Sequence, residues 1–205
     1  MFSNLSEKFG GYPVVRQWIP KAKAKTDSAL PPRPGTLLDK VTAVVISDTG
    51  WPSLTAADAA KDLGQAYGHF LVDDKTIIEC VPALTSSVGM VEQARFVKTR
   101  APNGTDDLHE TTIAVNLCFG GPIVGADAYA RWVALIARLC DRFELNPAEH
   151  LKRASDLDPA RRDPQQALQA AGSDFDKLKA AVGAKLNQAK PQPAKPPATP
   201  EAAHA

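Results

Sequence analysis

The chain has 205 residues, of which 44% are hydrophobic, so it can form one sizeable core but is short for two independent domains. Its 24 Lys and Arg residues against 23 Asp and Glu residues leave a formal charge of +1, which gives no overall attraction for nucleic acid or for an anionic membrane. No stretch approaches the roughly 18 apolar residues of a membrane span, and residues 1–9 lack the pattern of a signal peptide, so we expect synthesis in the cytoplasm.

The N-terminal part of the chain predicts an extended arm followed by a buried strand and a helix. Residues 12–18 favour a short strand or turn, and residues 22–34 are rich in lysine and proline, which pack poorly. The β-branched run at 40–47 is typical of a buried strand. Thr55 is a suitable N-cap for an alanine-rich helix that ends near Gly64. We therefore assign residues 1–35 to an N-terminal arm.

The middle of the chain predicts three more strands and one long helix. Residues 69–72 and 76–81 are strand-like, and the polar Asp73–Lys75 segment between them indicates a hairpin turn. Residues 111–119 predict another buried strand. At 127–143, apolar residues recur at spacings of three and four, which is typical of a helix that packs on the core.

The C-terminal part of the chain carries weaker patterns. Residues 174–186 favour a second helix, and the residues after it are rich in proline, alanine and lysine. We place the main domain at residues 36–172, a C-terminal helix at 173–188 and a disordered tail at 189–205. Strands interleaved with helices around one sheet predict an α/β or α+β domain.

The three cysteines, Cys80, Cys118 and Cys140, lie far apart, each in an apolar run. A disulfide or metal framework is recognised by paired or clustered cysteines, and an odd number at wide spacing does not fit one. The pattern favours buried free thiols.

Six segments, in order along the chain, resemble the zinc-dependent N-acetylmuramoyl-L-alanine amidase 2 family, which is related to the peptidoglycan recognition proteins. The likeness covers roughly residues 18–166. It implies an α/β fold with a central mixed β-sheet flanked by helices. The segments are IPK at 19–21 with RPGT at 33–36, VVISDTG at 44–50, GHFLVDD at 68–74, IIECVP at 77–82, TIAVNLC at 112–118 and RASDLDP at 153–159.

The positions that carry the family's chemistry are substituted. In the family, two histidines and a cysteine or aspartate hold a zinc ion; the resemblance places Ser47, Ala154 and Asp163 at these positions. Asn116 stands where many relatives have a glutamate, and Arg162 stands where a lysine often helps to stabilise the oxyanion. Neither a serine hydroxyl nor an alanine methyl is a zinc ligand. We therefore expect that the family's zinc has been lost and that no metal is bound.

The resemblance also places candidate substrate contacts. Ser86 and Ser87 replace part of a Trp-His-Ala-Gly segment that belongs to the family's substrate groove, and Tyr67 lies next to the position of a family tyrosine. Trp51 either lines the groove, where its aromatic face would suit a sugar ring, or packs against the following helix. His69 either contacts substrate or faces the core as part of a hydrogen-bond network.

These substitutions predict a catalytically inactive amidase homologue that serves as a peptidoglycan-binding or structural module, for example in a phage or secretion particle. Its partner would be peptidoglycan fragments, or another protein that contacts the arm or the tail. The alternative is a working amidase with a displaced zinc site built from His69, His150 and Asp163. In that alternative, His150 replaces the ligand lost at Ala154, because residues four apart share a helix face.

Overall fold

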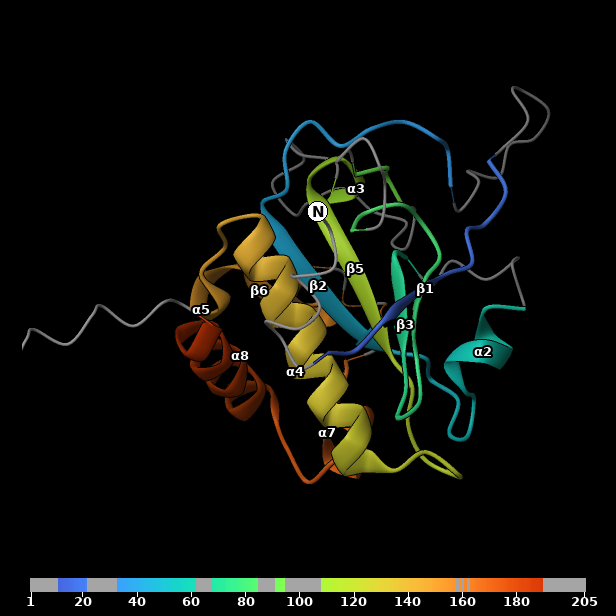
Figure 1. The fold of residues 1–205 in the computed structure, drawn as a ribbon, viewed down its shortest axis with the longest axis vertical. Coiled ribbons are helices and arrows are strands. Elements are labelled where there is room, and N and C mark those ends of the chain that lie inside the picture. The colour runs from blue at the N-terminus through green and yellow to red at the C-terminus, as the bar shows by residue number, and fades with distance from the viewer. Residues whose placement is uncertain are drawn as a thin grey trace, which may run out of the picture.

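The computed structural model describes residues 11–21, 33–61, 68–84, 91–94, 108–157, 159, 161 and 163–189. In this part of the chain, six strands form one sheet in the order β1-β4-β3-β5-β2-β6 (Figure 1). Only the β3–β4 pair is antiparallel, so the sheet is mixed, as the sequence predicts. The strands are β1 Val14–Arg16, β2 Ala43–Asp48, β3 Phe70–Val72, β4 Ile77–Glu79, β5 Thr112–Leu117 and β6 Leu151–Arg153.

Strands β5, β2 and β6 run in the same direction at the centre and edge of the sheet. Every residue of β5 is buried, and in β2 all are buried except Ser47. A strand that is covered on both faces reads as a continuous apolar run, which explains the β-branched segment at 43–46. Because the three strands are parallel, their carboxyl ends lie at the same end of the sheet, and the term edge hereafter refers to this row of strand ends.

The longest helix, α4, crosses one face of the sheet, and α8 packs beside it (Figure 1). The indole Nε1 of Trp132 on α4 donates to the Val72 carbonyl over 3.2 Å and so joins the helix to β3. On α8, Leu178 and Val182 are buried in the core. The helices are α2 Ala56–Ala59, α3 Leu108–Thr111, α4 Gly125–Arg142, α5 Pro147–His150, α6 Ala154–Leu157, α7 Gln165–Ala170 and α8 Phe175–Ala189.

Several local predictions are confirmed with shifted boundaries. Thr55 caps α2 by accepting from the Asp58 backbone N–H over 3.1 Å, but the helix ends at Ala59. The Asp73–Lys75 turn joins antiparallel strands, and the Asp73 carboxylate accepts from the backbone N–H groups of Lys75 and Thr76, each over 2.8 Å. Strand β6 and the short helices α3, α5, α6 and α7 are not predicted, since three to six residues are too few to show a period.

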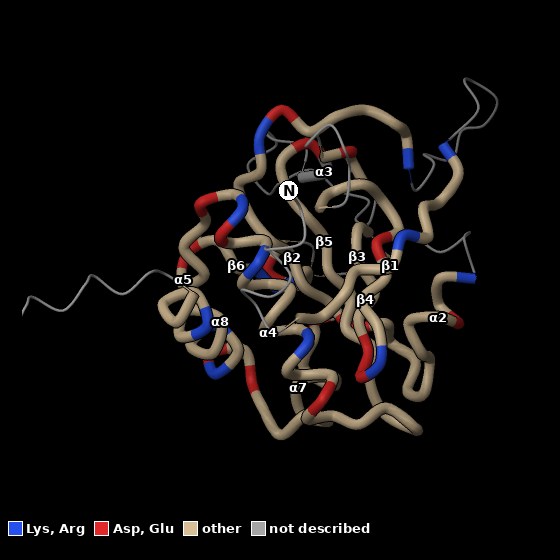
Figure 2. Tube along the Cα trace, viewed as in Figure 1, with Lys and Arg blue, Asp and Glu red and all other residues tan. Residues whose placement is uncertain are grey.

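The two ends of the chain differ in how they relate to this core. The short strand or turn predicted at residues 12–18 is a strand: within the range assigned to the arm, residues 14–16 form β1 and pair in parallel with β4. Residues 22–32 of the expected arm and 190–205 of the expected tail lie outside the described residues. Within the described ranges, no helix is both long and apolar enough to cross a membrane. Basic and acidic positions are interspersed along the described trace (Figure 2).

The three cysteines are free and buried, as predicted. Burial, assisted by the neighbouring Glu79 charge, raises the pKa of Cys80 to about 12. Burial alone raises the pKa of Cys140 to about 12, and burial is also the main reason that the pKa of Cys118 is raised. All three are therefore neutral thiols that pack as small apolar side chains at ordinary pH.

Candidate functional site at the carboxyl ends of the central strands

Three of the predicted site residues lie side by side at the carboxyl ends of β5, β2 and β6. Asn116 is opposite Ser47 in the β2–β5 register, and Ala154 directly follows Arg153, which is opposite Ile46 in the β2–β6 register. The Ser47 hydroxyl donates to Asn116 Oδ1 over 2.7 Å. We call these three residues, Asn116, Ser47 and Ala154, the strand-end row. In open sheets with parallel strands, ligands bind at this edge.

The turn after β2 carries an exposed aromatic side chain, Trp51, four residues after Ser47 in the sequence. Asp48 accepts from the Gly50 backbone N–H over 2.9 Å, and Gly50 adopts a positive φ of 76°, which glycine tolerates without strain. The turn leaves Trp51 with 62% of its surface exposed. Most of the Trp51 side chain is therefore accessible to solvent.

Thr49 adds a buried polar atom close to the same edge. Its backbone N–H donates to the Leu117 carbonyl over 3.1 Å, which continues the β2–β5 ladder past the end of β2. The residue is 7% exposed, and its Oγ1 has no hydrogen-bond partner among the described residues. A buried hydroxyl without a partner is costly and calls for an explanation.

Asp163 lies near the strand-end row and is held by two neighbours. Its Oδ2 atom pairs with the Arg153 guanidinium over 3.2 Å and accepts from the Ser155 hydroxyl over 3.1 Å. Arg153 also forms hydrogen bonds as short as 2.7 Å with Asp156. Burial opposes ionisation of Asp156, but the hydrogen bonds from Arg153 outweigh it and lower the pKa of that carboxyl. Arg153 further stacks on Phe175 of α8, with 5.3 Å between the guanidinium carbon and the ring centroid.

The residues at this edge do not fit a zinc ion. A zinc site needs three or four donors from Cys, His, Asp or Glu. The strand-end row supplies a hydroxyl, a carboxamide and a methyl group, and the nearby Asp163 carboxylate is paired with Arg153. Among the described residues, no group of three or more His, Cys, Asp or Glu side chains is placed to hold a metal ion.

His69 is an internal structural residue. It is fully buried just before β3, where Nδ1 accepts from the Ala114 backbone N–H over 3.0 Å and Nε2 bonds to the Glu92 carbonyl over 2.8 Å. Because one partner is a donor and the other an acceptor, the ring is a neutral tautomer with its proton on Nε2. The structure corrects the assignment of His69 as a substrate contact: it matches the core-network interpretation.

His150 does not share a helix face with Ala154. Helix α5 ends at His150, and β6 separates it from Ala154 at the start of α6. The His150 Nδ1 atom accepts from the Asn146 backbone N–H over 3.1 Å at the end of α5. The proposed displaced zinc set of His69, His150 and Asp163 is therefore not assembled, because the three are not placed as a group and both His69 nitrogens are occupied.

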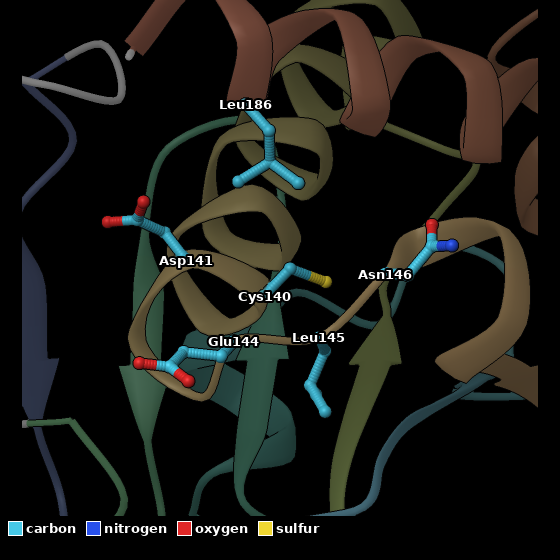
Figure 3. Close-up of a pocket in the computed structure, with 6 residues that line it drawn as sticks. All are labelled: Cys140, Asp141, Glu144, Leu145, Asn146 and Leu186. Carbon is cyan, nitrogen blue, oxygen red and sulfur yellow. The ribbon is translucent and has the colours of Figure 1, made fainter. Parts of the chain in front are cut away.

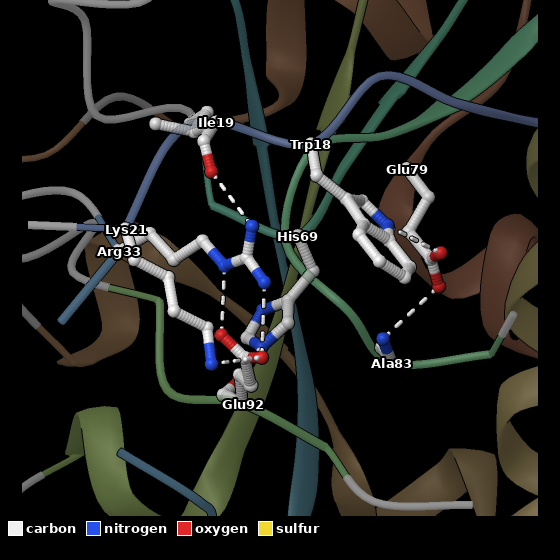
Figure 4. Close-up of polar contacts among 8 residues, drawn as sticks. All are labelled: Trp18, Ile19, Lys21, Arg33, His69, Glu79, Ala83 and Glu92. Carbon is white, nitrogen blue, oxygen red and sulfur yellow. Dashed lines mark hydrogen bonds and ion pairs between the residues drawn. The ribbon is translucent and has the colours of Figure 1, made fainter. Parts of the chain in front are cut away.

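A buried ion pair that no sequence pattern predicts lies beside His69 (Figure 4). Arg33 contacts both carboxylate oxygens of Glu92, over 2.7 and 3.0 Å, and donates to the Ile19 carbonyl over 2.8 Å. Lys21 forms a further ion pair with the Glu92 carboxylate over 3.3 Å. Burial opposes ionisation of Glu92, but the hydrogen bonds and charges of Arg33 and then Lys21 lower its pKa overall. A pair 59 residues apart in sequence leaves no local pattern to detect.

The remaining predicted residues, and one cavity, contribute nothing to the described site. Tyr67, Ser86, Ser87 and Arg162 lie outside the described residues. A cavity of about 310 Å³ opens between the end of α4 and α8 (Figure 3). None of the predicted site residues lines it; its lining is Cys140, Asp141, Glu144, Leu145, Asn146 and Leu186.

Solved structures resemble this fold, although no protein-family model and no curated protein matches the sequence. A mutant endolysin from Bacillus subtilis is 21% identical, with a TM-score of 0.63 over 84% of this chain and 99% of that one. The catalytic domain of XlyA is 20% identical, with a TM-score of 0.63 over 83% and 99%. Staphylococcus aureus hydrolase AmiA, solved in complex with its ligand, is 16% identical, with a TM-score of 0.60 over 91% of each chain.

These likenesses establish the class of fold. The mixed six-stranded sheet flanked by helices is the fold of amidase and endolysin catalytic domains, as the ordered motifs predict. At identities of 15–21% they establish the fold alone.

Proposed function

We propose that this protein uses an amidase-type fold to bind peptidoglycan fragments at the strand-end row, without hydrolysing them. The fold likeness to endolysin domains, and to a hydrolase solved with its ligand, supports a cell-wall role. The observation that carries the proposal is the composition of the strand-end row, which offers a carboxamide, a hydroxyl and a methyl group at the positions where the sequence resemblance expects metal ligands and a base.

The chemistry of the strand-end row supports binding over hydrolysis. Cleavage of an amide needs an activated water or nucleophile and a group that accepts a proton. The Ser47 hydroxyl bonds to Asn116, and a carboxamide does not accept a proton at neutral pH. Ser47 is therefore not activated as a nucleophile in the way that a serine paired with a histidine is.

Exposed groups around the row support a carbohydrate-containing ligand. Trp51 offers a large exposed aromatic face in the turn after β2. Aromatic side chains bury large areas at low entropic cost, so one at a rim suits a flat sugar ring. We keep Tyr67, Ser86 and Ser87 as further candidates for the groove. A protein partner that contacts residues 1–35 or the segment after residue 189 would attach this module to a phage or secretion particle.

Co-sedimentation with insoluble peptidoglycan tests the binding part of the proposal. The full chain and a variant that stops at Ala189, where α8 ends, should sediment equally with the polymer. Failure of both to sediment would contradict peptidoglycan binding. Sedimentation of the full chain alone would assign the contact to the last 16 residues and contradict binding at the strand-end row.

Metal analysis tests the claim that no hydrolysis occurs. After dialysis against zinc, we expect far less than one zinc ion per chain, because the described residues offer no set of three donors. About one tightly bound zinc ion per chain, together with release of soluble peptide from peptidoglycan, would contradict the proposal and support an active amidase.

A further inference from the structure

Ser47 and Asn116 present a matched pair of hydrogen-bonding groups at the edge of the sheet. The Ser47 hydroxyl donates to Asn116 Oδ1, which leaves the Ser47 lone pairs as acceptors and Asn116 Nδ2 as a donor. Among the described residues, no partner accepts from Asn116 Nδ2. Ser47 is the one residue of β2 that is not buried, so a ligand can reach it.

The pair keeps this character in either orientation of the carboxamide. If the Asn116 side-chain amide turns by half a rotation, Nδ2 donates to Ser47 Oγ, and the pair then presents Oδ1 as acceptor and the serine O–H as donor. In both arrangements one donor and one acceptor remain for a ligand. The complementary ligand group has one acceptor and one donor side by side, as a secondary amide does.

We propose that the Ser47–Asn116 pair binds an amide group of the ligand directly, without a metal ion. This inference rests on the proposed function, because peptidoglycan fragments carry both N-acetyl and peptide amides. Ala154 leaves the third place in the strand-end row occupied only by a methyl group. Ser47 and Asn116 are both uncharged, and the nearby Arg153 is already paired with Asp156 and Asp163, so these residues favour a neutral ligand group over a carboxylate.

The hydroxyl of Thr49 is a further buried polar group close to this edge. It lies two residues beyond Ser47, and its Oγ1 has no partner among the described residues although the residue is more than nine-tenths buried. A polar neighbour would satisfy this atom, whereas an apolar one would leave it unpaired.

An NMR titration tests the inference. The full chain is titrated with muramyl dipeptide, and the side-chain amide signals of Asn116 are monitored in nitrogen-15 spectra. The Asn116→Leu variant identifies those signals. We expect them to shift during the titration, and Ser47→Ala to weaken binding about three- to tenfold, the loss of one hydrogen bond. Dialysis against EDTA should leave the affinity unchanged.

Thr42→Ala is the matched control, because Thr42 carries a hydroxyl that bonds to Thr111 at the opposite end of the same strand pair. It should bind like the wild type. Two outcomes would overturn the amide contact and leave the proposed function standing. One is binding without a shift of the Asn116 signals; the other is equal affinity of the Ser47→Ala and Thr42→Ala variants. An affinity that falls after EDTA treatment would overturn direct recognition. No binding to muramyl dipeptide or to peptidoglycan would overturn both.

Discussion

At the scale of single residues, one pair decides how this edge of the sheet can act. The Ser47 hydroxyl donates to Asn116 Oδ1 over 2.7 Å, and its partner in this bond is a carboxamide, not a basic group. Asp163 is the carboxylate that the resemblance places at a ligand position. It forms an ion pair with Arg153. In the proposed function, the difference between binding and hydrolysis rests on these few side chains.

Restoring donors to the strand-end row should create a metal site. Ser47→His combined with Ala154→His places two imidazoles at adjacent strand ends, close to Asp163. We expect the double variant to retain about one zinc ion per chain after dialysis, and either single variant to retain far less. Zinc content by atomic absorption gives the answer. A folded double variant with no zinc would show that these positions do not converge on one point.

Removing the exposed aromatic side chain of Trp51 should weaken binding without affecting the fold. Trp51→Ala is expected to lower the affinity for peptidoglycan about tenfold, or about 1.4 kcal/mol. Its free energy of unfolding should change by no more than about 0.5 kcal/mol, since the side chain is largely exposed. Val15→Ala, an exposed apolar position on β1, is the control and should bind normally. Equal losses in both variants would contradict a local role for Trp51.

Residue roles were predictable only where an ordered motif placed them. The order of the motifs aligns Ser47, Asn116 and Ala154 with site positions of the amidase family, and the parallel register brings the three residues together. The role of His69 depended on partners 23 and 45 residues away, which no local pattern specifies. Sequence spacing also suggested a shared helix face for His150, but a strand intervenes.

At the scale of elements, Glu92 is the point where several segments are joined. Its carboxylate pairs with Arg33 and Lys21, its carbonyl accepts from His69, and its backbone N–H donates to Pro82 over 2.9 Å. The segment 91–94 is thereby attached to the start of β3 and to the segment before β2. Breaking one partner of such a buried pair leaves the other charge uncompensated.

The Glu92 pair should make stability depend on pH in the acid range. The folded-state pKa of Glu92 is lowered below 4.5, so its contribution is present above that value and declines as the pH falls through the lowered pKa. At pH 7 we expect Glu92→Gln to reduce the free energy of unfolding by about 3 kcal/mol. Urea unfolding should show this difference shrinking below pH 4. A difference that is independent of pH would contradict the assignment.

Helix α8 should be an integral part of the core. Leu178 is fully buried where α8 packs on α4, so Leu178→Ala should lower the free energy of unfolding by about 2–5 kcal/mol. Gln188→Ala, an exposed position on the same helix, should change it by no more than about 0.5 kcal/mol. Thermal or urea denaturation measures both. Similar values for the two variants would indicate that α8 is only loosely attached.

The accuracy of element prediction followed element length. Helix α4 repeats its apolar positions over 18 residues and was located to within two residues. Helix α8 gave a weaker pattern because, of its 15 residues, only Leu178 and Val182 are buried. Strand β6 is three residues long and is defined by its pairing with β2, so it could not be recognised before the sheet was known.

At the scale of the whole molecule, the fold explains why the site lies where it does. Parallel pairing of β5, β2 and β6 brings three strand ends to the same end of the sheet, while α4 and α8 pack together along one face (Figure 1). The order of six motifs was enough to predict this architecture. The lost metal ligands and the substrate contacts remain proposals, because fold likeness alone does not determine chemistry.

The most direct test of the central claim is one co-sedimentation measurement made with and without zinc. Protein treated with EDTA, and the same protein resupplied with zinc, are each incubated with insoluble peptidoglycan, and both the bound protein and the soluble peptide are measured. We predict equal binding in the two samples and no release of peptide in either. Release that appears only when zinc is present would contradict the account and identify the chain as a working amidase.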